Sequence, residues 1–532
     1  MNLRPELSQR LQQHLQAFTE GFRHNLALLG PQGSGKTYQL QHLLTHPPSG
    51  VLIISCPLYR ESCGSFLQRF VCAILQAMLP DAAPVRGGAL RSLEPLAQQI
   101  EGSSPRLAMA IRSIEGLLTR RQYGEAFTRT LDLIPIVSQE RGMSCVLILD
   151  EFLLLEELGL THAFHELGKR VMTWPTTLFI LSSSSLYRAR MILRERLQLL
   201  FGQFELLTLE ALDAPTVMAW MQQELRGIRR PKGMTNFLMD WLGAYPWYLT
   251  VFVNRLKERA TLSNSVELHE ALFLQAAWDV VGSAEGALHQ TCLARTGHLA
   301  TRGRGGSRAL EALLQVANGA RTATEIGKRI GRSGLTDALQ LLVEQDLAQR
   351  NGMCWIVTDP LLRCWLSTVL ASQWCDARTD APATRQRFNQ ALRGLWNEWV
   401  RAHQLSFSEQ IAGLFAKFSD DTVSLDLKTG RLPRFQTIHR AKPVEDRSME
   451  PYLVADAEGK RWCVTVQETG VDEQAIARFD AFCRAQAPKP SRKVVITKTP
   501  MDANARLLAK TANMWVWGPD DLSLLLELYG RA

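Results

Sequence analysis

A glycine-rich segment, Gly30 to Thr37, constrains this chain more than any other part of its sequence. It reads Gly-Pro-Gln-Gly-Ser-Gly-Lys-Thr and matches the pattern G-x-x-x-x-G-K-[ST] at every fixed position. Glycines let backbone amides close around phosphate oxygens, and the helix that follows points its positive end at them. A strand-like run at 24–29 precedes the segment, and apolar residues at helical spacing follow it at 38–44. This context predicts a phosphate-binding loop and a nucleoside triphosphate ligand.

The loop supplies most of the predicted nucleotide contacts. We expect Lys36 to reach the β- and γ-phosphates and Thr37 to bind Mg²⁺. The other loop residues assigned to nucleotide binding are Gly30, Pro31, Gln32, Gly33, Ser34 and Gly35. A glycine turn that matches the pattern by chance is the alternative, and the strand and helix around the segment argue against it.

A second apolar strand, residues 144–150, ends in the adjacent acids Asp150 and Glu151. Its composition suits a parallel strand covered on both faces. In enzymes with a phosphate loop such a strand lies beside the loop, so we expect Asp150 to hold the Mg²⁺ shell and Glu151 to polarise the attacking water. A buried strand can end in an acid by chance, but an adjacent pair downstream of a complete loop favours catalysis. Lys36, Asp150 and Glu151 are therefore the predicted catalytic residues.

Length and composition limit the rest of the chain. With 532 residues the chain is too long to form a single hydrophobic core, and about three or four domains are expected. The most apolar stretch, 146–155, is interrupted by two acids, so we expect no membrane span. The first residues lack an apolar signal core, and the ten cysteines show no Cys-x-x-Cys pair, which argues against zinc and a disulfide framework. A cytoplasmic location is predicted.

Positive charge permits a nucleic-acid partner without requiring one. The formal net charge is +8, spread over a large chain, with local clusters at 226–232 and 302–308. The second cluster, Arg-Gly-Arg-Gly-Gly-Ser-Arg, is rich in glycine. It is predicted to be a flexible linker first, with phosphate contact as a secondary role.

The pattern of the chain changes near residue 210. Up to that point strand and helix signals alternate, as in a parallel sheet with crossover helices. The expected strands are 26–30, 51–56, 145–150 and 177–182, and 80–102 is expected to be a loop or insertion. From 213 to about 281 the pattern is helical, which suits a lid over the nucleotide. The expected lid core comprises Trp220, Leu225, Phe237, Leu238, Trp241 and Leu242.

Four segments together resemble the archaeal-type ATPases, a family in the STAND and AAA+-like group of P-loop NTPases. They are the phosphate loop, the strand ending in Asp-Glu-Phe152, the serine run after 178–181, and the segment Gly-Ala-Tyr-Pro-Trp-Tyr-Leu at 243–249. The resemblance implies an ATPase that uses ATP and Mg²⁺. It also implies that the serine segment, Ser182 to Ser184, senses the γ-phosphate, with Ser182 taken as its nucleotide-binding residue, and that Pro246 of the lid lies against the nucleotide.

One departure from that family concerns an arginine. The family commonly carries Gly-Arg shortly after the sensor helix, where this chain has Gly202-Gln203. The preceding helix offers Arg188, Arg190, Arg194 and Arg196 as substitutes, although a solvated basic face also explains them. Hydrolysis is therefore expected to be slow or to need an arginine from a partner.

Residues 308–360 have the pattern of a winged helix. Helices are expected at 309–316, 323–330 and 334–345, followed by a wing that ends at Asp359-Pro360. Such domains often read DNA with the third helix, but 334–348 contain no Lys or Arg and include three acids. Packing of this domain against the ATPase core is therefore preferred to DNA reading, with Arg329, Arg332 and Arg350 still able to touch phosphates.

Residues from about 380 onward resemble the restriction-endonuclease-like fold. An active member needs an acid on one strand and an acid-x-lysine on the next, so that carboxylates hold Mg²⁺. The corresponding positions here are Tyr452, Thr465 and Gln467, so a domain kept for binding or assembly is expected rather than a nuclease. The nearby acids are Glu450, Asp456 and Glu468.

These features predict an α/β protein in four parts: a P-loop ATPase core with a parallel sheet (1–212), a helical lid (213–290), a linker and winged helix (291–375), and an endonuclease-like α/β domain (376–532). The expected function is an ATP-binding switch with slow Mg²⁺-dependent hydrolysis. Its C-terminal domains would engage DNA, a protein partner or a second copy of the chain. The alternatives are an ATP-dependent nuclease and an assembly ATPase that does not touch nucleic acid.

Overall fold

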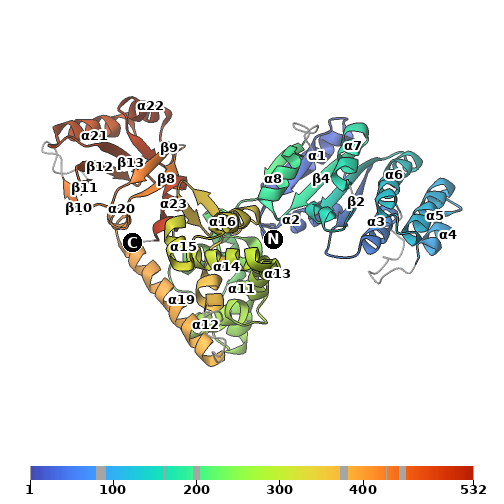
Figure 1. Cartoon of the computed structure of the whole chain (residues 1–532), viewed down its shortest axis with the longest axis horizontal. Helices are drawn as coiled ribbons and strands as arrows, with labels where there is room; N and C mark the ends of the chain where they lie inside the picture. The colour runs from blue at the N-terminus through green and yellow to red at the C-terminus, as the bar shows by residue number, and fades with distance from the viewer. Residues whose placement is uncertain are drawn as a thin grey trace. The chain divides into compact units, whose positions relative to one another are not determined.

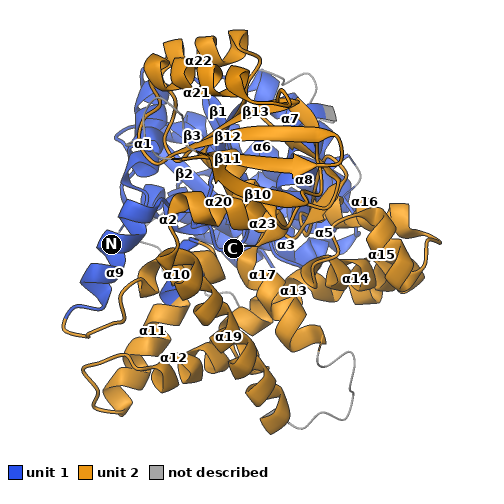
Figure 2. Ribbon diagram, turned by 90° about the vertical axis from the view of Figure 1, so that its left-hand side faces the viewer, with its two compact units in different colours: residues 1–226, 244–250 blue, residues 227–243, 251–532 orange. Residues whose placement is uncertain are grey.

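The computed structural model describes residues 2–78, 92–160, 162–195, 204–371, 381–426, 428–441 and 451–530. The chain forms two compact units (Figures 1 and 2). Unit 1 comprises Met1–Arg226 and Ala244–Thr250, and unit 2 comprises Gly227–Gly243 and Val251–Ala532. The finer domain boundaries at 212, 290 and 375 stay predictions.

Unit 1 is built on a parallel five-stranded sheet with the order β2-β3-β4-β1-β5. The strands are β1 (Asn25–Leu29), β2 (Val51–Pro57), β3 (Ser144–Asp150), β4 (Thr177–Ser183) and β5 (Phe204–Thr208). The side chains of β1 and β4 are buried throughout, as expected for a parallel strand that is covered on both faces. The α/β prediction is confirmed, and the four expected strands match to within one residue at each end.

Helices cover both faces of this sheet. On one face α1 (Pro5–Thr19) and α2 (Lys36–Thr45) pack against the even-numbered residues of β1, such as Leu26 and Leu28. On the other face lie α3 (Cys63–Met78), α5 (Pro105–Thr119), α6 (Tyr123–Arg141), α7 (Ala163–Thr173) and α8 (Leu186–Glu195). Figure 1 shows α3 to α6 grouped together next to β2. Unit 1 continues with α9 (Ala214–Glu224).

The region expected to be a loop or insertion contains a helix in its described part. This helix, α4 (Glu94–Ile100), buries Leu93, Ala97 and Ile100. Their spacing of four and three residues gives one apolar helical stripe, which a count of Pro and Gly residues does not detect. Residues 79–91 lie outside the described residues.

The first part of unit 2 is helical. It contains α10 (Met234–Leu242), α11 (Pro246–Leu262), which starts in unit 1, α12 (Glu270–Ala277) and α13 (Ala287–Thr301). The helical prediction for this region is confirmed, and the six residues expected in the lid core are all buried. No helix in the described part of the chain is long and apolar enough to cross a membrane.

The prediction of a flexible linker at 302–308 is wrong. These residues belong to α14 (Gly303–Ala317), which follows α13 after the single residue Arg302. A Cβ atom on Gly306 would lie 1.9 Å from the carbonyl oxygen of Leu299. Glycine therefore lets the two helices approach closely, and this packing outweighs its low helix propensity.

Three helices and a hairpin follow in the order expected for a winged helix. They are α14, α15 (Ala323–Ile330) and α16 (Leu335–Glu344), and then the antiparallel strands β6 (Gln349–Asn351) and β7 (Cys354–Ile356). After α17 (Pro360–Trp365) the chain enters the long helix α19 (Ala381–Gln404) and then α20 (Phe407–Phe415).

The C-terminal part of unit 2 contains a mixed five-stranded sheet with the order β10-β11-β12-β13-β14. Its strands are β10 (Thr437–Ala441), β11 (Tyr452–Ala457), β12 (Lys460–Gln467), β13 (Arg492–Thr497) and β14 (Trp515–Trp517). The helices α21 (Glu473–Ala485) and α22 (Ala503–Thr511) cover one face. The other face packs on α20, α23 (Pro519–Tyr529) and the hairpin β8 (Asp421–Leu425) and β9 (Lys428–Leu432).

Candidate nucleotide-binding site

The glycine-rich loop connects β1 to the start of α2 at the carboxyl edge of the parallel sheet. Gly33 and Gly35 have φ angles of +85° and +96°, a backbone region that favours glycine. Gly35 precedes α2, and no side chain caps the helix there, so the first amides of α2 remain available as donors. The local sequence thus builds the anion-binding helix terminus that the motif predicts.

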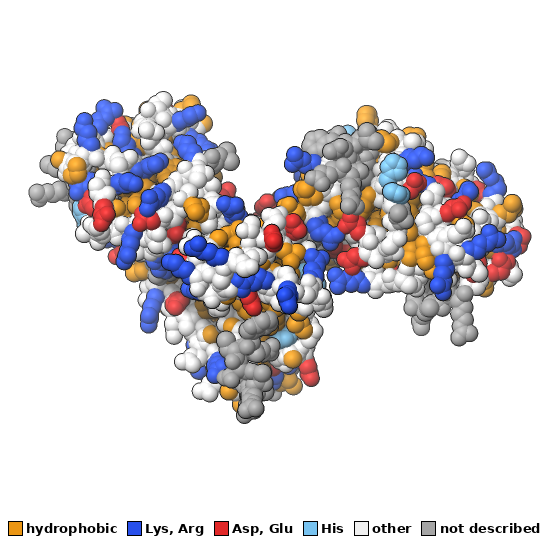
Figure 3. All heavy atoms as spheres, in the orientation of Figure 1, with side chains coloured by type: hydrophobic (Ala, Val, Ile, Leu, Met, Phe, Trp, Pro, Cys, Tyr) orange, Lys and Arg blue, Asp and Glu red, His pale blue; other side chains and the backbone are white. Residues whose placement is uncertain are grey.

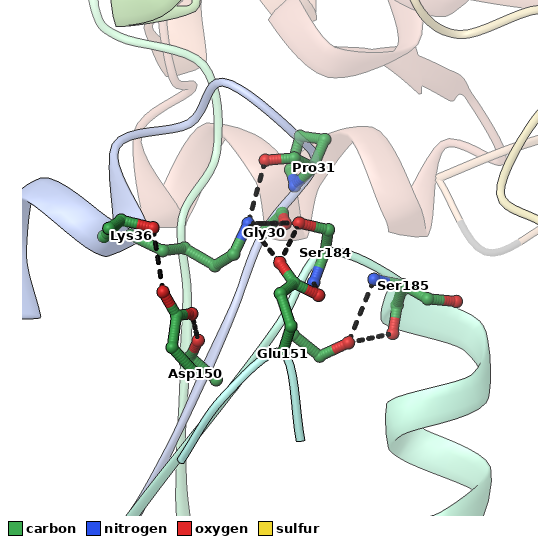
Figure 4. Close-up of polar contacts among 10 residues, drawn as sticks. Gly30, Pro31, Lys36, Asp150, Glu151, Ser184 and Ser185 are labelled. Atoms are coloured by element: carbon green, nitrogen blue, oxygen red, sulfur yellow. Dashed lines mark hydrogen bonds and ion pairs between the residues drawn. The ribbon is translucent and has the colours of Figure 1, made fainter. Parts of the chain in front are cut away.

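Lys36 is buried and its ammonium group lies at the centre of the site (Figure 4). Its Nζ donates to the carbonyl oxygens of Gly30 (2.7 Å) and Pro31 (3.2 Å) and to Ser184 Oγ (2.9 Å). A Glu151 carboxylate oxygen lies 4.0 Å from the same Nζ. Burial lowers the pKa of Lys36, and the charges of Glu151 and Asp150 oppose that shift.

Asp150, the last residue of β3, is hydrogen-bonded to the start of α2 and to β4. Thr37 Oγ1 donates to Asp150 Oδ2 at 2.9 Å, and Ser182 Oγ donates to Asp150 Oδ1. Carboxylate and hydroxyl oxygens are ligands that suit Mg²⁺, which usually takes its remaining ligands from phosphates and water. Within the described residues there is no cluster of three or more His, Cys, Asp or Glu that could hold a metal without such help. The donor set therefore fits Mg²⁺ that arrives with a nucleotide.

Glu151 has a different environment from its neighbour. Its backbone φ is +56°, which is uncommon for a residue other than glycine and is often found at functional sites. Its carboxylate accepts from the Ser184 backbone amide at 3.0 Å and from Ser184 Oγ. Ser184 therefore contacts both Lys36 and Glu151, whereas Ser182 contacts Asp150.

The predicted γ-phosphate segment spans Ser182 to Ser184, and the structure gives Ser182 and Ser184 different partners. Ser182 lies within β4, whereas Ser184 follows the end of that strand, and their hydroxyls reach different acids. The run of four serines at 182–185 was the available signal. A sequence pattern does not show which hydroxyl of such a run meets the lysine.

Pro246 lies beside the loop, and its contact with a nucleotide stays a prediction. A Cβ atom on Gly35 would be 3.7 Å from Pro246 Cγ, and the Trp247 amide donates to the Gly33 carbonyl at 3.2 Å. Both residues belong to unit 1, although they begin the helix α11. The lid motif is thus a direct neighbour of the phosphate loop.

Arg4 is a site residue that the sequence did not reveal. Its Nε donates to the Ser34 carbonyl oxygen at 3.2 Å, and its guanidinium group also donates to the Glu210 carbonyl oxygen. Burial lowers the pKa of Arg4, while the nearby Tyr245 and Asp213 oppose the shift. Arg4 therefore links the loop to the segment that follows β5.

The expected source of an activating arginine is not found at the site. Arg188 donates to the Glu156 carboxylate, while Arg190 and Arg194 are exposed on α8. Gln203 and Arg196 lie outside the described residues. Among the described arginines of α8, none contacts the loop or its acids.

The three positions compared with a nuclease triad hold neutral side chains. Tyr452 is buried against Phe479 and Phe482, and Gln467 Nε2 donates to Thr465 Oγ1 at 3.2 Å. The nearby acids have other partners or cannot be placed. Asp456 binds Arg461 and Glu468 lies 3.5 Å from Lys498, while Glu450 lies outside the described residues.

No model of a protein family and no curated protein matches the chain. Among solved structures, it is similar to a Walker-type ATPase of Pyrococcus abyssi, with 16% identity, a TM-score of 0.44, and coverage of 68% of this chain and 95% of that one. It is also similar to the Aeropyrum pernix ORC1 protein in complex with DNA, with 15% identity, a TM-score of 0.37, and coverage of 68% of this chain and 92% of that one. A third similar structure is the Thermotoga maritima RuvB Holliday junction branch migration motor, with 14% identity, a TM-score of 0.32, and coverage of 67% of this chain and 92% of that one. Function must therefore be argued from the residues of the site.

Proposed function

We propose that this protein binds ATP with Mg²⁺ and hydrolyses it slowly, and that unit 2 couples this cycle to DNA or to a protein partner. The observation that carries the proposal is the group formed by Lys36, Ser184 and Glu151 beside the Thr37–Asp150 pair. Charged groups buried at the end of a parallel sheet, next to free helix amides, suit a polyphosphate and its metal ion.

Each residue has a distinct part in this proposal. The loop amides and Lys36 bind the phosphates, and Lys36 exchanges a neutral carbonyl acceptor for a charged phosphate oxygen. Thr37 and Asp150 hold the metal ion, which when bound would neutralise phosphate charge. Glu151 orients the attacking water, and Ser182 and Ser184 fix the two acids.

The contacts of Glu151 explain why slow turnover is proposed. Its carboxylate is engaged by both the amide and the hydroxyl of Ser184, so it must exchange these donors before it can accept a proton from water. The arginines of α8 are directed elsewhere, which leaves charge stabilisation in the transition state to another source. An arginine from a second copy or another partner would fill that role.

The nuclease alternative has less support than the switch. Cleavage of a phosphodiester needs acids that hold a metal ion, and the positions compared above carry Tyr452, Thr465 and Gln467 instead. The alternative of an assembly ATPase without nucleic-acid binding shares the same nucleotide site. It differs from the proposal in the partner of unit 2.

The test measures ATP binding by calorimetry and turnover by phosphate release. Lys36→Ala should weaken ATP binding by about 100-fold, because a charge-assisted contact to the phosphates is lost. Glu151→Gln should keep the affinity and lower kcat. Lys169→Ala, which removes an exposed lysine of unit 1, is the matched control and should change neither quantity.

Unchanged ATP affinity in folded Lys36→Ala protein would exclude the site. Turnover measured over a range of protein concentrations tests the source of the arginine in the same experiment. Specific activity should rise with concentration if a second copy supplies it.

A further inference from the structure

The hairpin β6–β7 occupies the place of a wing, but its tip is packed against β8 within unit 2. The Met353 amide donates to the Thr422 carbonyl oxygen at 2.9 Å. The Asn351 side chain makes two hydrogen bonds to the Ser424 backbone, at 2.7 and 3.0 Å. A Cβ atom on Gly352 would lie 2.4 Å from the Thr422 carbonyl oxygen, so the approach is as close as glycine permits.

The second strand of this hairpin belongs to a core shared with the C-terminal part of unit 2. Cys354 and Ile356 are buried in the same apolar cluster as Val423. The hairpin is therefore packed into the core of unit 2 through contacts with β8. The neighbouring α16 has no Lys or Arg and exposes Asp337, so it also lacks what a helix needs to approach phosphates.

Positive charge is concentrated instead on α14 and on the end of α15. We call this surface the basic ridge and define it by Arg304, Arg308, Lys328, Arg329 and Arg332. All are exposed except Arg308, which is partly buried. Figure 3 shows blue Lys and Arg side chains on the face of unit 2 that carries α14 to α16.

Hydrogen bonds keep the two helices of the ridge together. Arg308 donates to the Gly331 carbonyl oxygen at 2.8 Å, and Arg329 donates to Gln315 Oε1 at 3.3 Å. Arg308 also binds Glu311, so it is the anchored member of the ridge. In the part of the chain that the structure describes, no carboxylate binds Arg304, Lys328 or Arg332.

The chemistry around the ridge favours phosphates over a protein surface. Among residues 303–350, all of them described, no large apolar side chain is exposed. Protein interfaces usually need buried aromatic or aliphatic anchors, whereas contacts to a phosphate backbone need positive charge and polar donors. The small residues Gly305 and Ser307 lie between Arg304 and Arg308 of α14 and leave its backbone open to close approach.

We propose that the basic ridge is the DNA-binding surface of this protein and that it holds the phosphate backbone without reading sequence through α16 or the wing. The proposal rests on the proposed engagement of DNA by unit 2 and names the surface that would perform it. It predicts binding that depends strongly on salt and weakly on sequence.

The experiment measures anisotropy of a fluorescein-labelled DNA duplex at several salt concentrations, with the full chain. The ridge variant combines Arg304→Gln, Lys328→Gln and Arg332→Gln, which removes the charge while keeping a polar side chain and good helix propensity. The matched control combines Arg387→Gln, Arg401→Gln and Lys489→Gln, three exposed residues of unit 2 with the same change in charge. Circular dichroism and ATP binding verify that both units are folded.

The ridge variant should bind about tenfold more weakly or worse, and the slope of log K against log salt should fall by about 2.7 for three lost phosphate contacts. The control variant should bind as the wild type does. If the wild type binds no duplex, the proposed engagement of DNA is wrong along with the ridge. If the wild type binds and the ridge variant binds equally well, the ridge is wrong while engagement of DNA stands. Displacement of the duplex by poly-glutamate at equal charge concentration would overturn the assignment to nucleic acid.

Discussion

Unit 1 and unit 2 both contain parallel strands whose carboxyl ends carry polar residues, and the two sets are satisfied in different ways. In unit 1 the acids at the end of β3 accept hydrogen bonds from the hydroxyl groups of Thr37, Ser182 and Ser184. In unit 2 Gln467 and Thr497 are paired in register at the ends of β12 and β13. Gln467 donates to Thr465, and the Thr497 hydroxyl donates to the Thr499 carbonyl oxygen at 2.8 Å.

The difference is one of charge as well as of contacts. A buried carboxylate is costly unless donors surround it, and unit 1 supplies those donors from the loop and from β4. The neutral groups of unit 2 satisfy one another at little cost and carry no charge that could hold a metal ion. Parallel strand ends occur in both sheets but carry different side chains, so a proposed role must be argued from those side chains rather than from the strands.

The largest expected effect comes from removing the charge of Asp150. Asp150→Asn keeps the shape of the side chain but weakens the metal contact, so ATP turnover should fall by about 100-fold or more. Thr465→Val is the matched change at the strand ends of unit 2. It should leave turnover unchanged and lower stability by about 1 kcal/mol, because a hydrogen bond to Gln467 is lost. Equal turnover in the two variants would remove the distinction between these strand ends.

A smaller effect is expected where unit 2 does hold a paired acid. Arg461 donates twice to Asp456, at 2.6 and 3.1 Å, and holds the pKa of that carboxyl below its usual range. A depressed folded pKa stabilises the protein above the unfolded value, near 3.9, and this contribution is lost as pH falls through the folded pKa. Asp456→Asn should therefore cost about 1 kcal/mol at neutral pH, since the pair is partly exposed.

The free energy of unfolding of the wild type and of Asp456→Asn is measured by urea unfolding at several pH values. The difference between them should be constant from pH 7 to about 5 and should shrink below about 4. Glu458→Gln, at an exposed acid between β11 and β12, serves as the control and should have little effect at any pH. A difference that persists unchanged at low pH would show that Asp456 stabilises by packing rather than by charge.

The sequence predicts the sheet of unit 1 well because its strands are continuous apolar runs. It does not reveal β5, whose Phe-Glu-Leu-Leu-Thr is short and partly exposed. The edge strands β10 and β14 of unit 2 are equally hard to recognise, because a strand of few residues leaves little periodicity to detect. The glycines of α14 suggest a linker in the sequence, but their close contact with α13 depends on tertiary packing, which no local pattern encodes.

The residues of the candidate site also fall into those that a local sequence pattern indicates and those that depend on tertiary contacts. Lys36, Thr37 and Asp150 belong to local patterns with fixed spacing, and the structure brings these three residues together. Arg4 contacts residues that lie 30 and 206 positions away, and no local pattern encodes such contacts. Local motifs thus identify the groups to which we assign chemistry, while the residues that position those groups depend on the folded chain.

The smallest expected effect concerns DNA cleavage by unit 2, because Tyr452, Thr465 and Gln467 supply neither the acids nor the lysine of the nuclease pattern. Supercoiled and linear DNA incubated with the protein, ATP and Mg²⁺ or Mn²⁺ should remain intact. The variant Glu450→Ala, Glu468→Ala removes acids near these strands, and any trace of cleavage that comes from a contaminant should persist in it. Glu468 lies 3.5 Å from Lys498, so an acid and a lysine do meet close to β12, although outside the pattern of a nuclease site. Cleavage by the wild type that disappears in the folded double variant would show that unit 2 has a catalytic centre of its own and would favour the nuclease alternative.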